Sequence, residues 1–251
     1  MAPLDESRGN GGYTRAAADN AAWRTPAMTP SYVVHYTTRL PAVKSGWDDP
    51  AWAEAEPLSI DQFHPQSSEH HPKVQARLLH DGKALAAIYR VEDRYVVCRQ
   101  SGLNAMVCKD SCVEFFVRPK SGKGYMNFEI NCGGNILSQY VEDWTREDGK
   151  FKKSQFVAEK FLKMIEIFTA LKAPITEELP GPVTYTVSFR IPFGVFEAYL
   201  GALGDVHGQV WHANCYKCAD ESSHPHWAAW SNVGENLNFH QPERFGVMRL
   251  E

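Results

Sequence analysis

Apolar and polar residues alternate with a period of two along much of the chain, which is typical of β-strands that bury one face. The clearest example is VTYTVSFRI, where the apolar residues from Val183 to Phe189 alternate with Thr and Ser. The same pattern predicts strands at residues 31–38, 73–80, 84–91, 112–119, 125–132, 135–144 and 245–250. Asp81 and Gly82 separate two of these stretches, so we expect residues 73–91 to form a hairpin.

Two stretches depart from the alternation and predict short helices. Trp52, Ala55 and Leu58 have the spacing of one helical turn, and Asp48 or Asp49 precedes them in a position to cap it. Residues 154–171 fit a helical period at first and an alternating period afterwards. We therefore expect a short helix followed by a strand in that segment.

Some nine or ten strands joined by Gly, Pro and Asp turns favour an all-β fold. The predicted architecture is an antiparallel, jelly-roll-like β-sandwich with one or two short helices. No internal repeat or low-complexity linker divides the chain, so residues 31–251 are expected to form a single domain. Residues 1–30 are rich in Ala, Gly, Asn, Thr and Pro and are expected to form an N-terminal arm.

Composition and charge narrow the function classes. The 251 residues are 43% hydrophobic and carry a formal net charge of -4, which argues against nucleic acid as a partner. No apolar run approaches the roughly 20 residues of a membrane span, so no membrane insertion is expected. The first residues lack the apolar core of a secretory signal, which predicts a cytoplasmic protein, or an extracellular one if the start is trimmed or mis-assigned. Nothing in the pattern specifies an oligomeric state.

The stretch from Trp211 to Phe245 concentrates the candidate chemistry. Here aromatic residues lie among amides, carboxylates, cysteines and histidines without a helical period. A sugar ring offers apolar C–H faces and a rim of hydroxyl groups, so it needs aromatic faces beside hydrogen-bonding side chains. This stretch therefore favours a saccharide as the partner.

Several motifs resemble the family 9 carbohydrate-binding modules and their family-9-like relatives. They are WDDPAWAEAEPL at residues 47–58, DSCVEFFVRP at 110–119, YMNFEIN at 125–131, FRIPF at 189–193, AAWSN at 228–232 and FHQPERFGVMRL at 239–250. Each motif is short, but their order and spacing agree over residues 47–250. The resemblance implies non-catalytic binding of a chain end or small sugar between two aromatic rings, in a jelly-roll-like sandwich.

The resemblance also suggests individual site residues. Glu114 matches the family's ligand-binding acid, Glu129 stands where the family has an arginine, and Val107 aligns close to one of the family's two stacking tryptophans. Trp227, Tyr216 or Trp144 is a candidate to replace that ring, and Arg90 is expected on the same outward face as the acids. The predicted sugar-binding residues are Glu114, Glu129, Asn131, Asn236, Phe239, Trp227, Tyr216 and Arg90.

Metal sites are weaker candidates. Cys215 and Cys218, followed by His224 and His226, suit zinc only if the cysteines lie in a tight turn, because residues three apart on a strand face opposite sides. The alternative, which we expect of all six cysteines, is a buried free thiol. We expect no required cofactor, and the one cofactor left open is a structural calcium ion on the acidic loops, at Asp48, Asp49 and Asp61.

Two other functions stay open at this point. A glycan-active enzyme would use Glu114 and Glu129 as its carboxyl pair. The other is a haem-binding electron-transfer domain, because some sandwiches of related architecture resemble such domains. It would use Met106 and a histidine as axial ligands.

Overall fold

The computed structural model describes residues 29–251, so the predicted arm lies almost entirely outside the described residues. Sixteen strands, two short α-helices and three 3-10 turns follow one another in the described part of the chain. The predicted all-β sandwich is confirmed, although more short strands are present than the alternation indicated.

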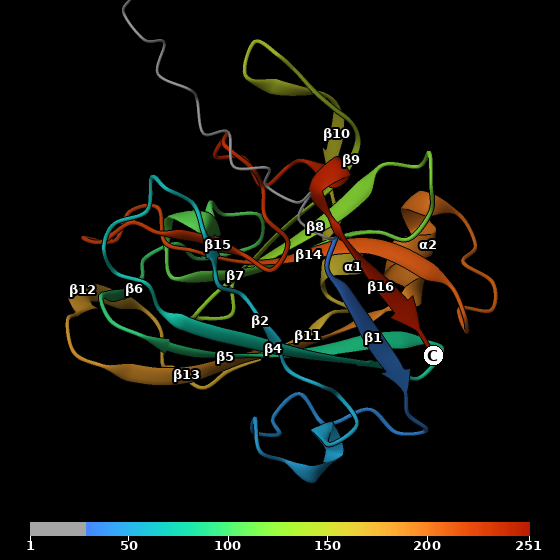
Figure 1. The fold of residues 1–251 in the computed structure, drawn as a ribbon, viewed down its shortest axis with the longest axis horizontal. Helices are drawn as coiled ribbons and strands as arrows, with labels where there is room; N and C mark the ends of the chain where they lie inside the picture. Colours follow the sequence, from blue (N-terminus) through green and yellow to red (C-terminus); the bar gives the residue numbers. More distant parts are fainter. Residues whose placement is uncertain (1–28) are drawn as a thin grey trace, which may run out of the picture.

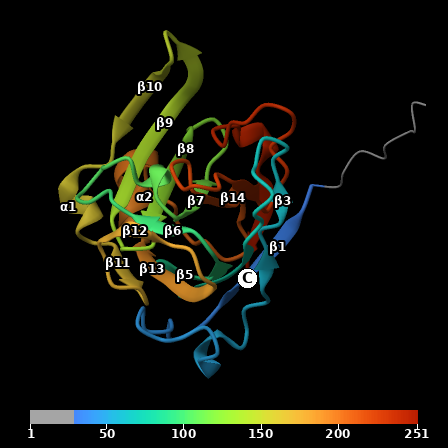
Figure 2. The ribbon, with the colours of Figure 1, turned by 90° about the vertical axis from the view of Figure 1, so that its left-hand side faces the viewer.

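Two layers of strands face each other across a shared apolar core (Figure 1). The first layer runs in the order β10 (Lys150–Phe156), β9 (Ile136–Glu147), β8 (Tyr125–Asn131), β7 (Cys112–Arg118), β14 (Val210–Cys218) and β16 (Gly246–Leu250). The second contains β2 (Leu58–Ser59), β4 (Lys73–His80), β5 (Ala84–Asp93), β13 (Val183–Pro192) and β11 (Glu166–Thr169). The hairpin of β9 and β10 projects beyond the rest of the sandwich (Figure 2).

The first described strand joins the two layers. β1 (Ser31–Tyr36) pairs in parallel with β16 through its first four residues and in parallel with β4 through its last two. The other pairings between the long strands are antiparallel, including the predicted hairpin of β4 and β5. β1 therefore joins the two layers into one continuously hydrogen-bonded sheet.

Short elements surround the two layers. They are the strands β3 (Gln62–Phe63), β6 (Val96–Cys98), β12 (Ile175–Leu179) and β15 (Trp227–Ala229), and the 3-10 turns η1 (Pro50–Trp52), η2 (Val107–Lys109) and η3 (Pro242–Arg244). Asp49 caps η1 as expected, but the turn ends at Trp52. Pro57 disfavours helical backbone at the residue before it, so the predicted helix does not reach Leu58.

The sequence predicted the first of the two α-helices but not the second. Residues 154–171 contain α1 (Glu159–Leu162) followed by β11, which confirms the expected helix and strand. The second helix, α2 (Phe193–Leu200), starts directly after Pro192, where the alternation of β13 ends. It buries Phe196 against Trp211, with ring centroids 5.8 Å apart. No helix of residues 29–251 is long and apolar enough to cross a membrane.

The outer face of β7, β8 and β14 is buried. Val113, Phe115 and Val117 point into the core as predicted, but Glu114 on the other face is only 2% exposed. Residues 231–245 lie over this face, because the segment is tied to β14 by Asn214 Nδ2, which donates to Ser231 O, and by Tyr216 OH, which donates to Phe239 O. The segment has no hydrophobic period, so the sequence alone did not reveal this cover.

Candidate functional site

A pocket of 480 Å³ opens on the outer face of the first layer. Its floor comes from β7, β8, β9 and the end of β14, and its walls come from residues 106–108, 220–227 and 237–240 and from Phe156 at the end of β10. The lining residues are Met106, Cys108, Glu114, Glu129, Leu137, Gln139, Phe156, Cys218, Asp220, Trp227, Leu237, Asn238, Phe239 and His240. The pocket therefore gathers aromatic, acidic and amide side chains in one place.

A pair of buried carboxyl groups forms part of the floor. Glu114 and Glu129 are direct cross-strand partners, so their side chains leave the sheet side by side on the same face. Cys218 Sγ donates to Glu114 Oε1 at 3.1 Å, and Asn127 Nδ2 donates to Glu129 Oε1 at 2.7 Å. Of the residues that the structure describes, none of the side chains lining this pocket is Lys or Arg.

In this environment the two carboxyl groups keep their protons to a higher pH than they would in water. Burial, followed by the nearby charge of Glu129, raises the pKa of Glu114 well above its ordinary value. Burial also raises the pKa of Glu129 to about 7, although the Asn127 hydrogen bond opposes that shift. A protonated carboxyl group both donates and accepts hydrogen bonds, which suits it to a ligand hydroxyl group.

Two aromatic rings line the same pocket. Phe239 stacks flat on the buried Tyr216, with ring centroids 4.1 Å apart and an interplanar angle of 9°. The opposite face of Phe239 is thus the one available to a ligand. Trp227, on β15, is held by its Nε1, which donates to Asp220 Oδ1 at 2.8 Å. Trp227 and Phe239 both pack against the small apolar cluster that contains Val107.

The structure brings some predicted site residues together and separates others. Glu114, Glu129, Trp227 and Phe239 line the pocket, and Tyr216 lies beneath Phe239 without lining it. Val107 is fully buried, so the nearby ring at the pocket comes from Trp227 instead.

Besides Tyr216, three predicted residues lie outside the pocket lining. Asn131 is buried and donates through Nδ2 to Asp110 Oδ2 at 2.8 Å and to Gln100 O at 2.9 Å. Arg90 is on β5, in the opposite layer, where it pairs with Glu92 at 3.4 Å. Asn236 is exposed, and the asparagine of its loop that lines the pocket is Asn238.

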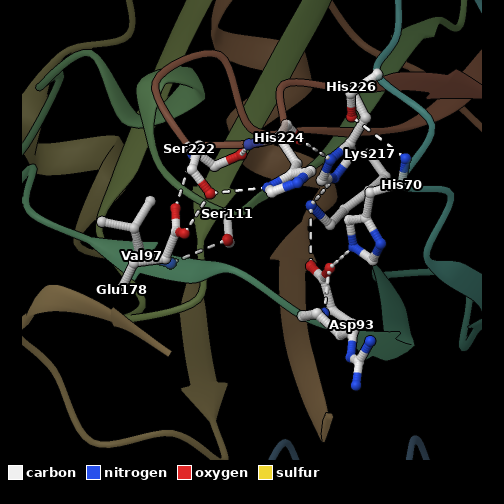
Figure 3. A network of polar contacts seen from close by, with 12 residues as sticks. His70, Asp93, Val97, Ser111, Glu178, Lys217, Ser222, His224 and His226 are labelled. Carbon is white, nitrogen blue, oxygen red and sulfur yellow. Dashed lines mark hydrogen bonds and ion pairs between the residues drawn. The ribbon is translucent and has the colours of Figure 1, made fainter. Parts of the chain in front are cut away.

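The cysteines and histidines proposed for zinc do not converge. Cys215 lies in the core between the layers, whereas Cys218 lies in the cluster on the outer face. The His226 ring instead contacts Lys217 Nζ at 2.7 Å (Figure 3). His224 stacks on Tyr95, with ring centroids 3.7 Å apart. Because residues 210–218 form a strand, the two cysteines face opposite sides of it.

The calcium and haem candidates are placed as follows. Asp49 Oδ1 accepts from Ala51 N, Asp61 Oδ1 accepts from Gln62 Nε2, and Asp48 is exposed. Across residues 29–251, these aspartates form no group of three ligand atoms within reach of one ion. Met106 and His240 both line the pocket, but Nδ1 of His240 is hydrogen-bonded to Tyr125 OH at 2.7 Å.

Sequence reasoning missed several pocket residues. Cys108 comes from the turn η2, Asp220 and Asn238 come from loops without a period, and Gln139 is a polar residue on β9. Asn238 stands next to the predicted Phe239, so a search for amides beside the aromatic platform would have found it.

Fold and pocket define a β-sandwich with an aromatic and acidic binding pocket on one sheet. The chain belongs to carbohydrate-binding family 9, whose family model matches residues 51–250. No curated protein sequence matches the chain.

Solved structures share the fold. A candidate carbohydrate-binding protein from Bacteroides uniformis is 28% identical, with a TM-score of 0.76 over 89% of this chain and 100% of its own. A family 9 module from Caldicellulosiruptor kristjanssonii was solved with cellotriose (17% identity, TM-score 0.59, covering 88% of this chain and 94% of that one). A family 9 module from the same organism was solved with glucose (15% identity, TM-score 0.57, covering 88% of this chain and 96% of that one).

Proposed function

We propose that the protein binds a saccharide, a glucan chain end or a small sugar, in the pocket between β7, β8 and the loops that carry Trp227 and Phe239. The proposal rests on one observation: a pocket of 480 Å³ is lined by two aromatic rings and by two carboxyl groups whose pKa values are raised. That volume lies within the roughly 300–1,000 Å³ of small-molecule sites.

The pocket side chains divide the recognition of a sugar between them. The free face of Phe239 and the ring of Trp227 offer apolar surface to the C–H faces of a pyranose. Glu129, Gln139 and Asn238 supply donors and acceptors for its hydroxyl groups. Family membership, and the glucose and cellotriose bound to the Caldicellulosiruptor modules, favour a glucose-based ligand.

Calorimetry with glucose, cellobiose and cellotriose, preceded by a glycan array, tests the proposal. Phe239→Ala and Trp227→Ala should each weaken binding about tenfold, because one stacking contact contributes roughly 1–1.5 kcal/mol. Trp144→Ala is the matched control, since Trp144 packs on Tyr125 and does not line the pocket. A blank array, or equal loss in all three variants, would contradict the proposal.

Hydrolysis of a glycan is the second candidate function. The raised pKa of Glu129, about 7, is a property that general acids in glycoside hydrolysis share, and Glu114 lies directly opposite. Incubation with a panel of oligosaccharides would release reducing ends in the wild type and not in Glu129→Gln. Binding without turnover would leave carbohydrate binding as the function.

A further inference from the structure

Two thiol groups and a carboxyl group meet beneath the pocket. Cys112 and Cys218 are direct partners across the pairing of β7 and β14, and Glu114 lies two residues after Cys112 on the same face. The two Sγ atoms and a carboxylate oxygen of Glu114 all lie within 4.8 Å of one another, and all three residues are buried. Within residues 29–251, this is the one group of three or more such ligand atoms that lies so close together.

The charge around these three residues favours a cation. Glu129 is the cross-strand partner of Glu114, and Asp220 lines the same pocket. Among residues 29–251, the one hydrogen bond to the Glu114 carboxyl group comes from Cys218 Sγ. No Lys or Arg of the described chain lines the pocket, and the neighbouring Lys217 is already paired with Asp93.

The geometry suits a tetrahedral ion. A Zn–S bond is about 2.3 Å, so two thiolates on one ion lie about 3.8 Å apart, a spacing that small side-chain rotations reach from the observed arrangement. Glu114 and Cys218 line the pocket, which gives an ion a path of entry. A fourth coordination position would face the pocket.

We propose that Cys112, Glu114 and Cys218 bind a soft divalent metal ion, with zinc as the favoured species. Thiolate ligands select zinc over calcium and magnesium, which prefer oxygen ligands. These three ligands share only Cys218 with the zinc residues predicted from the sequence. Cys215, His224 and His226 are excluded, because their side chains contact other parts of the protein. The inference does not depend on saccharide binding, and its tests contain no sugar.

The first test is calorimetric titration of the reduced, chelator-treated protein with zinc chloride. We expect one ion per chain, and at least about tenfold weaker binding in Cys112→Ser and in Cys218→Ser. Cys215→Ser is the control, because Cys215 lies on the same strand as Cys218 but points into the core. Absence of zinc binding by the wild type, or equal affinity in all three variants, would overturn the proposal.

The second test needs no variant and therefore survives a variant that fails to fold. X-ray absorption spectroscopy of the zinc-loaded wild type should show two sulfur ligands together with oxygen or nitrogen ligands. Cobalt bound in place of zinc should give a thiolate-to-metal charge-transfer band. A first shell of oxygen and nitrogen alone would overturn the proposal, since it would place the ion at other side chains.

Discussion

Lys217 and Cys218 are neighbours on β14, yet they belong to two buried polar clusters of opposite character. Lys217 is completely buried between the layers, where its Nζ lies 3.3 Å from Asp93 Oδ2 and donates to His226 Nε2 and to Cys218 O. His70 Nε2 donates to the other oxygen of Asp93 at 2.7 Å (Figure 3). This cluster carries its own positive and negative charge.

The cluster on the other face of the strand is built differently. Glu114 and Glu129 lie side by side with a thiol and an amide as their donors, and no Lys or Arg of residues 29–251 lines their pocket. Their pKa values rise, whereas Lys217 and the His70 hydrogen bond lower the pKa of Asp93 despite its burial. A buried carboxylate paired with a protein cation holds the fold together, whereas the two glutamates, whose donors are neutral, keep capacity to bind a ligand.

The histidine beside Lys217 supports the structural role of the first cluster. Burial, followed by the charge of Lys217, lowers the pKa of His226 to about 3, so its ring stays neutral and accepts the Lys217 proton donor. His226 Nδ1 donates to His224 O at 2.9 Å, in the segment that directly precedes Trp227. The cluster therefore positions the loop that carries an aromatic wall of the pocket.

The largest expected effect comes from Lys217→Met, which leaves the charge of Asp93 buried without its cation. Breaking a buried pair in this way costs about 3–5 kcal/mol of unfolding free energy, and urea denaturation at pH 7 would measure it. The double variant with Asp93→Asn should recover part of that loss, because both charges are then gone. A single-variant loss below about 1 kcal/mol would show that the pair is not structural.

The same cluster should also make the stability of the fold depend on pH, and this effect is smaller than the loss expected for Lys217→Met. Burial alone would raise the pKa of Asp93, but Lys217 and His70 more than offset it, so the folded pKa lies below the unfolded one. The unfolded state thus binds more protons as the pH falls below about 4, and the stability from this group is lost in acid.

Urea denaturation of the wild type and Asp93→Asn, in steps from pH 7 to pH 3, measures this difference. The wild-type advantage should stay constant above about pH 5 and shrink at lower pH. An advantage that grows in acid would contradict the assigned pairing.

The sequence predicted the strands better than it predicted the site, and particular residues show why. The alternation of residues 112–131 correctly placed Glu114 and Glu129 on one face, because a period of two is a local property. That the face is covered depends on residues 231–245, which have no period of their own. Likewise Asn131 follows the alternation, but its amide is bound by Asp110 from a distant loop.

The cysteines show the same limit. The C-x-x-C spacing draws attention to Cys215 and Cys218, whereas the strand geometry separates them and brings Cys112 opposite Cys218. That contact arises from the pairing of strands far apart in the chain, which no local pattern reports. The lysine that pairs with Asp93 was missed for the same reason.

The smallest expected effect comes from Glu114→Gln in the second cluster. Burial and the neighbouring Glu129 raise the pKa of Glu114 well above its ordinary value, so near pH 4 the folded carboxyl group is neutral and an amide of similar size replaces one neutral group by another. We expect a change in unfolding free energy within about 1 kcal/mol at pH 4, with chelator present so that no bound metal contributes. As the pH rises above about 4, the wild type should lose stability relative to the variant, because the unfolded state releases the Glu114 proton while the folded state keeps it. A loss as large as that of Lys217→Met would mean that Glu114 is charged and paired in the fold, and the two clusters would then be alike.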